Sequence, residues 1–280
     1  MPRKLLIAAA LATTVAGSHA AAQVAPPASG ATQDQRRAER SDRFYVALWW
    51  VAPSAQPLGR RTVAEGDYVV RSRLLPPSLI RLTADAVAQR GNRVVLPAGT
   101  QLFGLSTGRV PIWCALARRS SGASVGGSLL GGLVGARAPS QTCLIDLDDD
   151  GRLDAYFSAG SPVGGVPNFS GHRPRNPAPL TGAAFERLQP DQIETEFFVG
   201  IRYEGLSTIG ANPYFSISFG NERNREALSR TVSAERGSNV VTALGAEFEI
   251  LRRVGETIEV DVRRNIPRQP FHVMQTIRYR

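Results

Sequence analysis

The chain has 280 residues, of which 42% are hydrophobic and 20% are charged, and its formal net charge is +9 at pH 7. A chain of this length can bury one large or two small hydrophobic cores. No lysine follows Lys4, and the arginines that carry the remaining positive charge are scattered along the sequence, which argues against nucleic acid as a partner.

The first 22 residues have the layout of a secretory signal peptide. Arg3 and Lys4 precede an apolar run from Leu5 to about Val15, and small residues follow as far as Ala22. The apolar run is shorter than the ~20 residues that a transmembrane helix needs, and no cysteine at the cleavage point offers a lipid anchor. We therefore expect a mature chain of about 258 residues in the periplasm or outside the cell. Loss of Arg3 and Lys4 lowers its formal charge from +9 to +7.

The segment 23–42 is rich in proline, alanine, serine and charge, and it is predicted to be a disordered linker. A β-rich domain is predicted over 43–159. A short capped helix is predicted from Thr83 to Arg90, closed by Gly91. Aromatic and β-branched segments predict strands, at 44–51, 68–74, 80–82, 93–96, 100–103, 110–116 and 142–145.

A proline- and glycine-rich connector is predicted at 160–182, before a second β-rich block at 183–280. The strands of this block alternate apolar and polar residues, and Val254-Gly255 predicts a tight hairpin. Such alternation gives each strand one buried and one solvated face, which favours antiparallel sheets in a sandwich or barrel-like arrangement, as one or two subdomains. The predicted strands are 194–204, 214–219, 240–251, 257–262 and 271–279.

The two cysteines, Cys114 and Cys143, both lie in the mature part of the chain. An exported location makes a disulfide between them the expected state. A redox role is disfavoured because nothing in the sequence resembles a Cys-x-x-Cys motif.

The most informative stretch is 146–154, which places Asp146, Asp148, Asp150 and Asp154 around Gly151. A calcium ion takes six to eight oxygen ligands at roughly 2.3 to 2.6 Å, and this spacing can supply several of them. Five aspartates within nine residues repel one another, and a divalent cation relieves that repulsion. The alternative is an acidic hairpin turn at Asp150-Gly151 without an ion.

This pattern, D-x-D-x-D-G-x-x-D, resembles the strand-loop-strand calcium motif of integrin α-subunit propellers and FG-GAP repeats. The resemblance covers nine residues of the chain. It implies that the four aspartates are calcium ligands, that Arg152 contributes its backbone carbonyl, and that Gly151 adopts a positive φ. Phe157 stands where the helix-flanked loop of calmodulin has a glutamate. One loop does not imply the propeller fold, and the resemblance implies a structural rather than a regulatory ion.

Other candidate sites are weaker. Ser124 lies in a Gly-x-Ser-x-Gly pattern typical of a hydrolase nucleophile elbow, with His172 and His272 as the histidines left after signal cleavage. The apolar stretch 125–136 is too short to span a membrane. Paired carboxylates for glycoside hydrolysis would have to come from strand positions, where period-two spacing favours a solvated face: Glu194, Glu196, Glu247 and Glu249.

These observations predict an exported, mainly β protein with a structural calcium loop, one disulfide, and a non-enzymatic binding or envelope-structural role. Its candidate partners are a cell-envelope component or a glycan, since net positive charge attracts anionic lipid headgroups and acidic polysaccharides. Two alternatives stay open. One is an outer-membrane β-barrel protein, because the alternating strands approach ten residues, and the other is a secreted hydrolase that uses Ser124.

Overall fold

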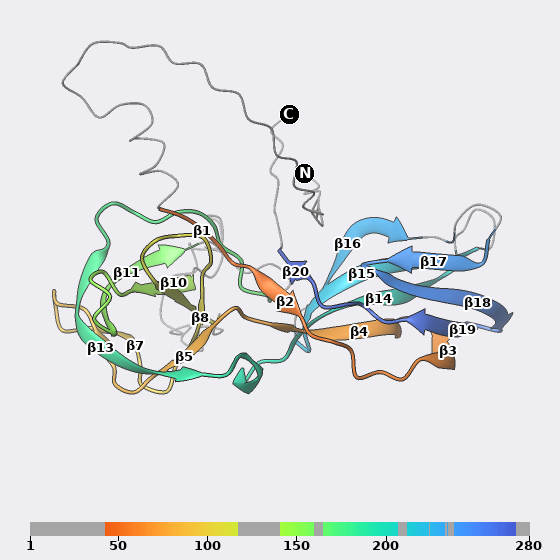
Figure 1. Ribbon diagram of the computed structural model, residues 1–280, viewed down its shortest axis with the longest axis horizontal. Helices are drawn as coiled ribbons and strands as arrows, with labels where there is room; N and C mark the ends of the chain where they lie inside the picture. The colour runs from red at the N-terminus through yellow and green to blue at the C-terminus, as the bar shows by residue number, and fades with distance from the viewer. Residues whose placement is uncertain are drawn as a thin grey trace, which may run out of the picture.

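The computed structural model describes residues 43–116, 141–159, 165–206, 212–223, 225–232, 234 and 238–272. Apart from one 3₁₀ turn, η2 (Pro190–Gln192), the elements found in these residues are β-strands, and all their pairings are antiparallel. The predicted fold class, mainly β with sandwich and barrel-like sheets, is confirmed. Figure 1 shows a barrel at one end of the molecule and two larger sheets at the other.

Six strands close into a barrel in the order β10-β11-β13-β5-β8-β9, with β9 paired back onto β10. Both faces of several barrel strands are buried, in two separate hydrophobic clusters. This explains why these segments are continuously apolar rather than alternating. The bounds are β5 (Leu79–Leu82), β8 (Gln101–Gly104), β9 (Ile112–Ala115), β10 (Gln141–Ile145), β11 (Arg152–Ala159) and β13 (Ala178–Leu188).

The other end of the molecule consists of two sheets whose apolar faces share one core. Phe215 of the first sheet and Phe248 of the second meet edge to face, with ring centroids 5.1 Å apart. The first sheet has the order β16-β15-β14-β4-β2-β20, namely Arg225–Val232, Pro213–Asn221, Phe197–Leu206, Tyr68–Leu75, Trp49–Val51 and Pro270–Phe271. The second has the order β17-β18-β19-β3, namely Val240–Ala243, Ala246–Val254, Thr257–Arg264 and Gly59–Ala64.

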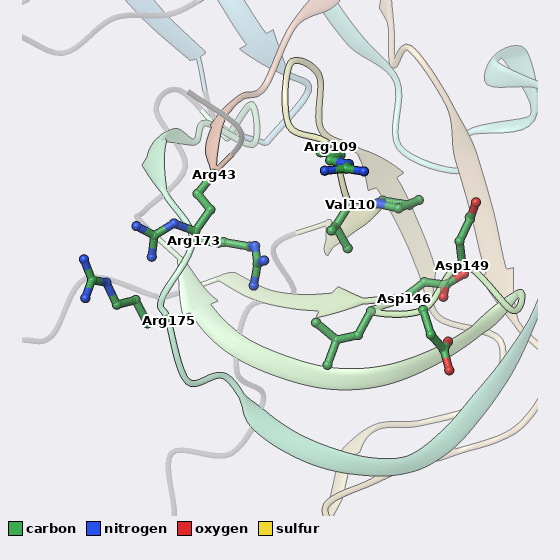
Figure 2. Close-up of a pocket in the computed structure, with 10 residues that line it drawn as sticks. Arg43, Arg109, Val110, Asp146, Asp149, Arg173 and Arg175 are labelled. Carbon is green, nitrogen blue, oxygen red and sulfur yellow. The ribbon is translucent and has the colours of Figure 1, made fainter. Parts of the chain in front are cut away.

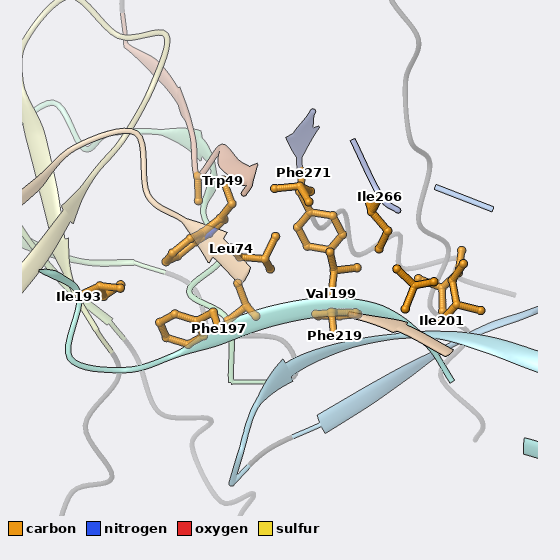
Figure 3. Packing of buried hydrophobic residues seen from close by; sticks show 14 of the residues in the cluster. Trp49, Leu74, Ile193, Phe197, Val199, Ile201, Phe219, Ile266 and Phe271 are labelled. Atoms are coloured by element: carbon orange, nitrogen blue, oxygen red, sulfur yellow. The ribbon is translucent and has the colours of Figure 1, made fainter. Parts of the chain in front are cut away.

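Trp49 joins the core of the sheets to the barrel. Its indole stacks on Phe103 of β8 at 5.5 Å and lies 5.1 Å from Phe197 of β14, centroid to centroid. The indole N–H donates to the carbonyl of Pro167 at 3.1 Å, which satisfies its polar group inside the core. Figure 3 shows Trp49 and Phe197 in one row of apolar side chains that continues to Phe271.

The sheets do not follow the order of the chain. β4 pairs with β14 and β3 pairs with β19, so the predicted blocks 43–159 and 183–280 contribute strands to the same sheets. Two strands begin inside the predicted connector 160–182, because β12 (Ser170–His172) pairs with β1 (Phe44–Val46) and β13 starts at Ala178.

The predicted helix at 83–90 is wrong. The segment contains instead the short strand β6 (Ala86–Val87), which pairs with β7 (Val94–Leu96). The Asp85 carboxylate, which helix-start rules would place at an N-terminal cap, accepts the backbone N–H of Ala98 at 2.7 Å. Ala86 and Ala88 are buried at alternate positions, and this favours extended chain over helix.

Two segments that were each predicted as one strand contain two strands in the structure. The segment 44–51 contains β1 and β2, which belong to different sheets. The prediction at 240–251 contains a hairpin, with Leu244 at φ 51° and Gly245 at φ 75° between β17 and β18. The buried positions change phase across this two-residue turn, from Val241 on one side to Ala246 and Phe248 on the other, and the sequence prediction did not detect that change. The hairpin predicted at Val254-Gly255 is confirmed, with Val254 opposite Thr257.

Removal of the disulfide between Cys114 and Cys143, which lie opposite each other on β9 and β10, should destabilise the protein. The bond closes a loop with a sequence separation of 29. Chain-entropy arguments assign such a loop about 3.5 kcal/mol of unfolding free energy. We expect the double variant Cys114→Ala/Cys143→Ala to lose roughly this amount in urea unfolding, and reduced wild-type protein to match it. An unchanged urea midpoint would contradict this expectation.

Candidate metal centre

The acidic loop connects two neighbouring strands of the barrel, β10 and β11. Its four aspartates at alternating positions, Asp146, Asp148, Asp150 and Asp154, each present a carboxylate oxygen to a common centre, and these oxygens lie within 4.8 Å of one another. The group can hold a metal ion. The side chains range from buried Asp146 to exposed Asp148 and Asp150, so one end of the cluster is fixed in the protein and the other faces solvent.

Asp146 anchors the cluster. Its side chain is almost fully buried, with 2% of its surface exposed, and its two oxygens accept the backbone N–H groups of Asp150 at 3.2 Å and Gly151 at 3.0 Å. Burial raises the pKa of the Asp146 carboxyl because it penalises the charged form, and the nearby charge of Asp154 adds to the rise. Hydrogen bonds from the loop backbone act in the opposite direction.

The backbone turns sharply between the ligand positions. Asp149 has φ 61° and Gly151 has φ 83°, so the chain passes twice through the left-handed region, which glycine and aspartate enter at lower cost than other residues. The predicted positive φ of Gly151 is confirmed. The loop is closed by the Leu147 N–H, which donates to Asp154 at 3.0 Å, and by the Arg152 N–H, which donates to Asp150 at 2.8 Å.

The size of the cluster suits a single ion. Two oxygens on opposite sides of a calcium ion are about 4.6 to 5.2 Å apart, twice the usual metal-oxygen distance, and every pair in the cluster is within 4.8 Å. Each carboxylate oxygen that accepts a backbone N–H retains lone pairs for a metal. The separations of the oxygens are therefore compatible with one coordination shell.

The barrel holds the loop at both ends. Cys143, three residues before Asp146, is bonded to Cys114 across β9 and β10, and the Asp146 N–H donates to the carbonyl of Pro111 at 3.3 Å. The cysteine pair suggests an oxidising, exported environment. At the other end, the Arg152 guanidinium donates to the carbonyl of Gly182 at 3.2 Å. The Arg152 carbonyl stays a predicted ligand.

The candidate hydrolase residues are only partly described by the structure. Ser124 and the stretch 125–136 lie outside the described residues. His172 packs its ring edge to face on Phe44 at 5.3 Å, and His272 lies 3.0 Å from the Ala47 carbonyl at a different strand end.

The four strand glutamates form ion pairs with arginines. Glu194 pairs with Arg81, Glu196 with Arg71, and both Glu247 and Glu249 with Arg263. Glu247 and Glu249 lie on β18 with partly exposed side chains, as the period-two spacing predicts, whereas Glu194 and Glu196 precede β14 rather than lying on a strand.

An arginine-lined cleft, which the sequence did not predict, lies beside the acidic loop. The cleft has a volume of about 820 Å³, and its walls carry Arg43, Arg109, Arg173 and Arg175 together with residues of the acidic loop. Figure 2 shows Arg43, Arg173 and Arg175 on one side and Asp146 and Asp149 on the other. The arginines come from three separate segments, so no sequence motif marks them.

Comparison with protein-family models, with curated proteins and with solved structures found no match to this chain. In the part of the chain that the structure describes, no helix is long and apolar enough to cross a membrane.

Replacement of Asp146 by Ala should lower the unfolding free energy even without a metal. The backbone N–H groups of Asp150 and Gly151 would lose their acceptor, at a cost of about 1 to 3 kcal/mol. The control is Asp148→Ala, which removes an exposed carboxylate of the same cluster and, because it relieves repulsion there, should not lower the calcium-free stability. Urea unfolding in calcium-free buffer measures both, and equal stability of the two variants would contradict the anchoring role of Asp146.

Proposed function

We propose that this is an exported β protein whose acidic loop holds one calcium ion as a structural staple, and that its role is binding or envelope-structural rather than enzymatic. The observation that carries the proposal is the convergence of four carboxylate oxygens within 4.8 Å of one another. Calcium is the cation that such an all-oxygen, carboxylate-rich loop suits best.

The donor set favours calcium over other common cations. The cluster offers only carboxylate oxygens, whereas zinc prefers histidine and cysteine ligands. Magnesium needs a rigid octahedron with oxygens at about 2.0 to 2.1 Å and usually keeps several waters, so it takes only one or two carboxylates from a protein. Calcium accepts six to eight oxygens in a flexible shell, which suits a cluster of four carboxylates better.

A staple rather than a switch is supported by the way the loop is held. Hydrogen bonds within the loop, the Asp146 contact with Pro111 and the neighbouring disulfide fix its conformation. A switch needs two alternative arrangements that the ion can shift. Exported calcium modules usually bind the ion at about 10⁻⁴ to 10⁻³ M, which extracellular calcium saturates.

Calcium should raise the thermal midpoint of the wild-type protein. With a Kd in that range, about 5 mM calcium adds roughly 1 to 2 kcal/mol to the unfolding free energy, which is about 2 to 8 °C for a chain of this size. Magnesium at the same concentration should have a smaller effect. Differential scanning calorimetry of the mature protein, desalted first to remove bound metal, makes the measurement.

Two variants test whether the acidic loop is responsible. Asp148→Ala removes one oxygen of the cluster and should abolish most of the calcium-induced shift. Asp191→Ala removes an exposed carboxylate from η2 and should retain the full shift. A wild-type midpoint that does not respond to calcium, or a shift that survives in Asp148→Ala, is incompatible with the proposal.

A further inference from the structure

The arginines of the cleft come from separate segments and gather in one place. Some arginines on the strands pair with glutamates, as in Arg202 with Glu204 at 2.7 Å and Arg252 with Glu259 at 2.6 Å. Within the part of the chain that the structure describes, Arg109, Arg173 and Arg175 form no ion pair, although aspartates line the same cleft. Their positive charge is therefore available to a ligand.

Arg173 provides a second indication. Its Nε atom is buried and has no hydrogen-bond partner. A buried donor without an acceptor is costly, and native structures rarely leave one unless an unobserved group satisfies it. Arg173 lines the cleft, and a turn of its side chain would let an oxyanion there supply such an acceptor, because carboxylates and phosphates match the fork of N–H groups on a guanidinium.

The wall that carries Arg109 is held firmly. The Tyr45 hydroxyl donates to the backbone carbonyl of Val110 at 3.0 Å and accepts the backbone N–H of Val110 at 3.3 Å. Tyr45 therefore binds both backbone polar groups of Val110. Gly108 allows this contact, since a Cβ atom there would meet the Tyr45 ring at 1.7 Å.

The opposite wall is tied to the same strand. The backbone N–H of Arg173 donates to the backbone carbonyl of Arg43 at 3.0 Å, next to the pairing of β1 with β12. Strand β1 and the residue before it thus position both groups of arginines. Because the backbone of both walls is held in place, a ligand has to order only the arginine side chains when it binds.

We infer that this cleft binds an acidic carbohydrate through at least two oxyanion groups, one near Arg109 and one near Arg173 and Arg175. The lining is mostly charged, with Val110, Pro111 and Leu147 as its apolar residues, so it suits a polar body rather than an acyl chain. The anionic group can be a carboxylate, as in uronic acids, or a phosphate, as in sugar phosphates.

The inference goes beyond the proposed calcium site, and only its calcium dependence rests on that proposal. Asp146, Asp148 and Asp149 line the cleft, and their negative charge opposes anion binding. A bound calcium ion lowers the formal negative charge of this wall by two, so ion and anion should strengthen each other's binding. This coupling is reciprocal by thermodynamic necessity.

Isothermal titration calorimetry tests the inference with three probes: trigalacturonate for carboxylates, fructose 1,6-bisphosphate for phosphates, and neutral maltotriose as the reference. Calcium is removed by desalting rather than with a chelator, since polycarboxylate chelators would compete for the arginines. We expect one charged probe to bind, more tightly with calcium and more weakly at high salt, while maltotriose does not. The charged probe that binds identifies the source of the oxyanion.

Arginine variants connect binding to the cleft. Arg109→Gln and Arg175→Gln each replace an exposed arginine and should weaken binding at least about tenfold, the loss typical of a hydrogen bond to a charged group. Arg187→Gln removes one exposed charge from β13, outside the cleft, and should leave the affinity unchanged. Circular dichroism melts confirm that each variant is folded.

Three results would overturn the inference: no binding of either charged probe, binding of maltotriose with equal affinity, or equal weakening in Arg187→Gln and the cleft variants. Asp148→Ala separates this inference from the calcium proposal. Probe binding that persists in this variant without calcium supports the cleft even if the ion site fails.

Discussion

The repulsion among the aspartates of one short loop is the constraint on which the functional account depends. Four carboxylate oxygens lie within 4.8 Å of one another, and like charges at this distance disfavour the arrangement unless something compensates. Part of the compensation comes from the loop, because Asp146 accepts two backbone N–H groups in a buried position. We assign the remaining compensation of this repulsion to a bound cation.

The barrel makes this arrangement persist. The acidic loop runs from the end of β10 to the start of β11, and the disulfide joins β10 to β9. In the loop that precedes β9, the carbonyl of Pro111 accepts the backbone N–H of Asp146. The same preceding loop carries Arg109 and is held by Tyr45. One set of contacts therefore fixes the acidic cluster and one arginine wall, so the structure places opposite charges on facing sides of one cleft. A ligand with both oxyanions and metal-binding oxygens would complement both sides.

The acidic loop could be predicted because its ligands and its turn residues are contiguous in the sequence. The strands could be predicted from alternation, but the change of phase at the two-residue turn of Leu244 and Gly245 was too short a signal to separate two strands. The helix prediction at 83–90 was wrong because this segment pairs with β7, and the Asp85 carboxylate accepts the backbone N–H of Ala98 in the neighbouring turn. The arginine cleft was beyond prediction, since it depends on the pairing of β1 with β12, more than a hundred residues apart. Pairing between distant strands is set by tertiary packing, which local residue patterns do not encode.

The most direct test of the central claim is a crystal structure of the mature protein grown with calcium, with anomalous scattering used to locate the ion. The account predicts one calcium peak per chain, about 2.3 to 2.6 Å from oxygens of Asp146, Asp148, Asp150 and Asp154. Carboxylates that point separately into solvent, with no peak between them, would contradict it.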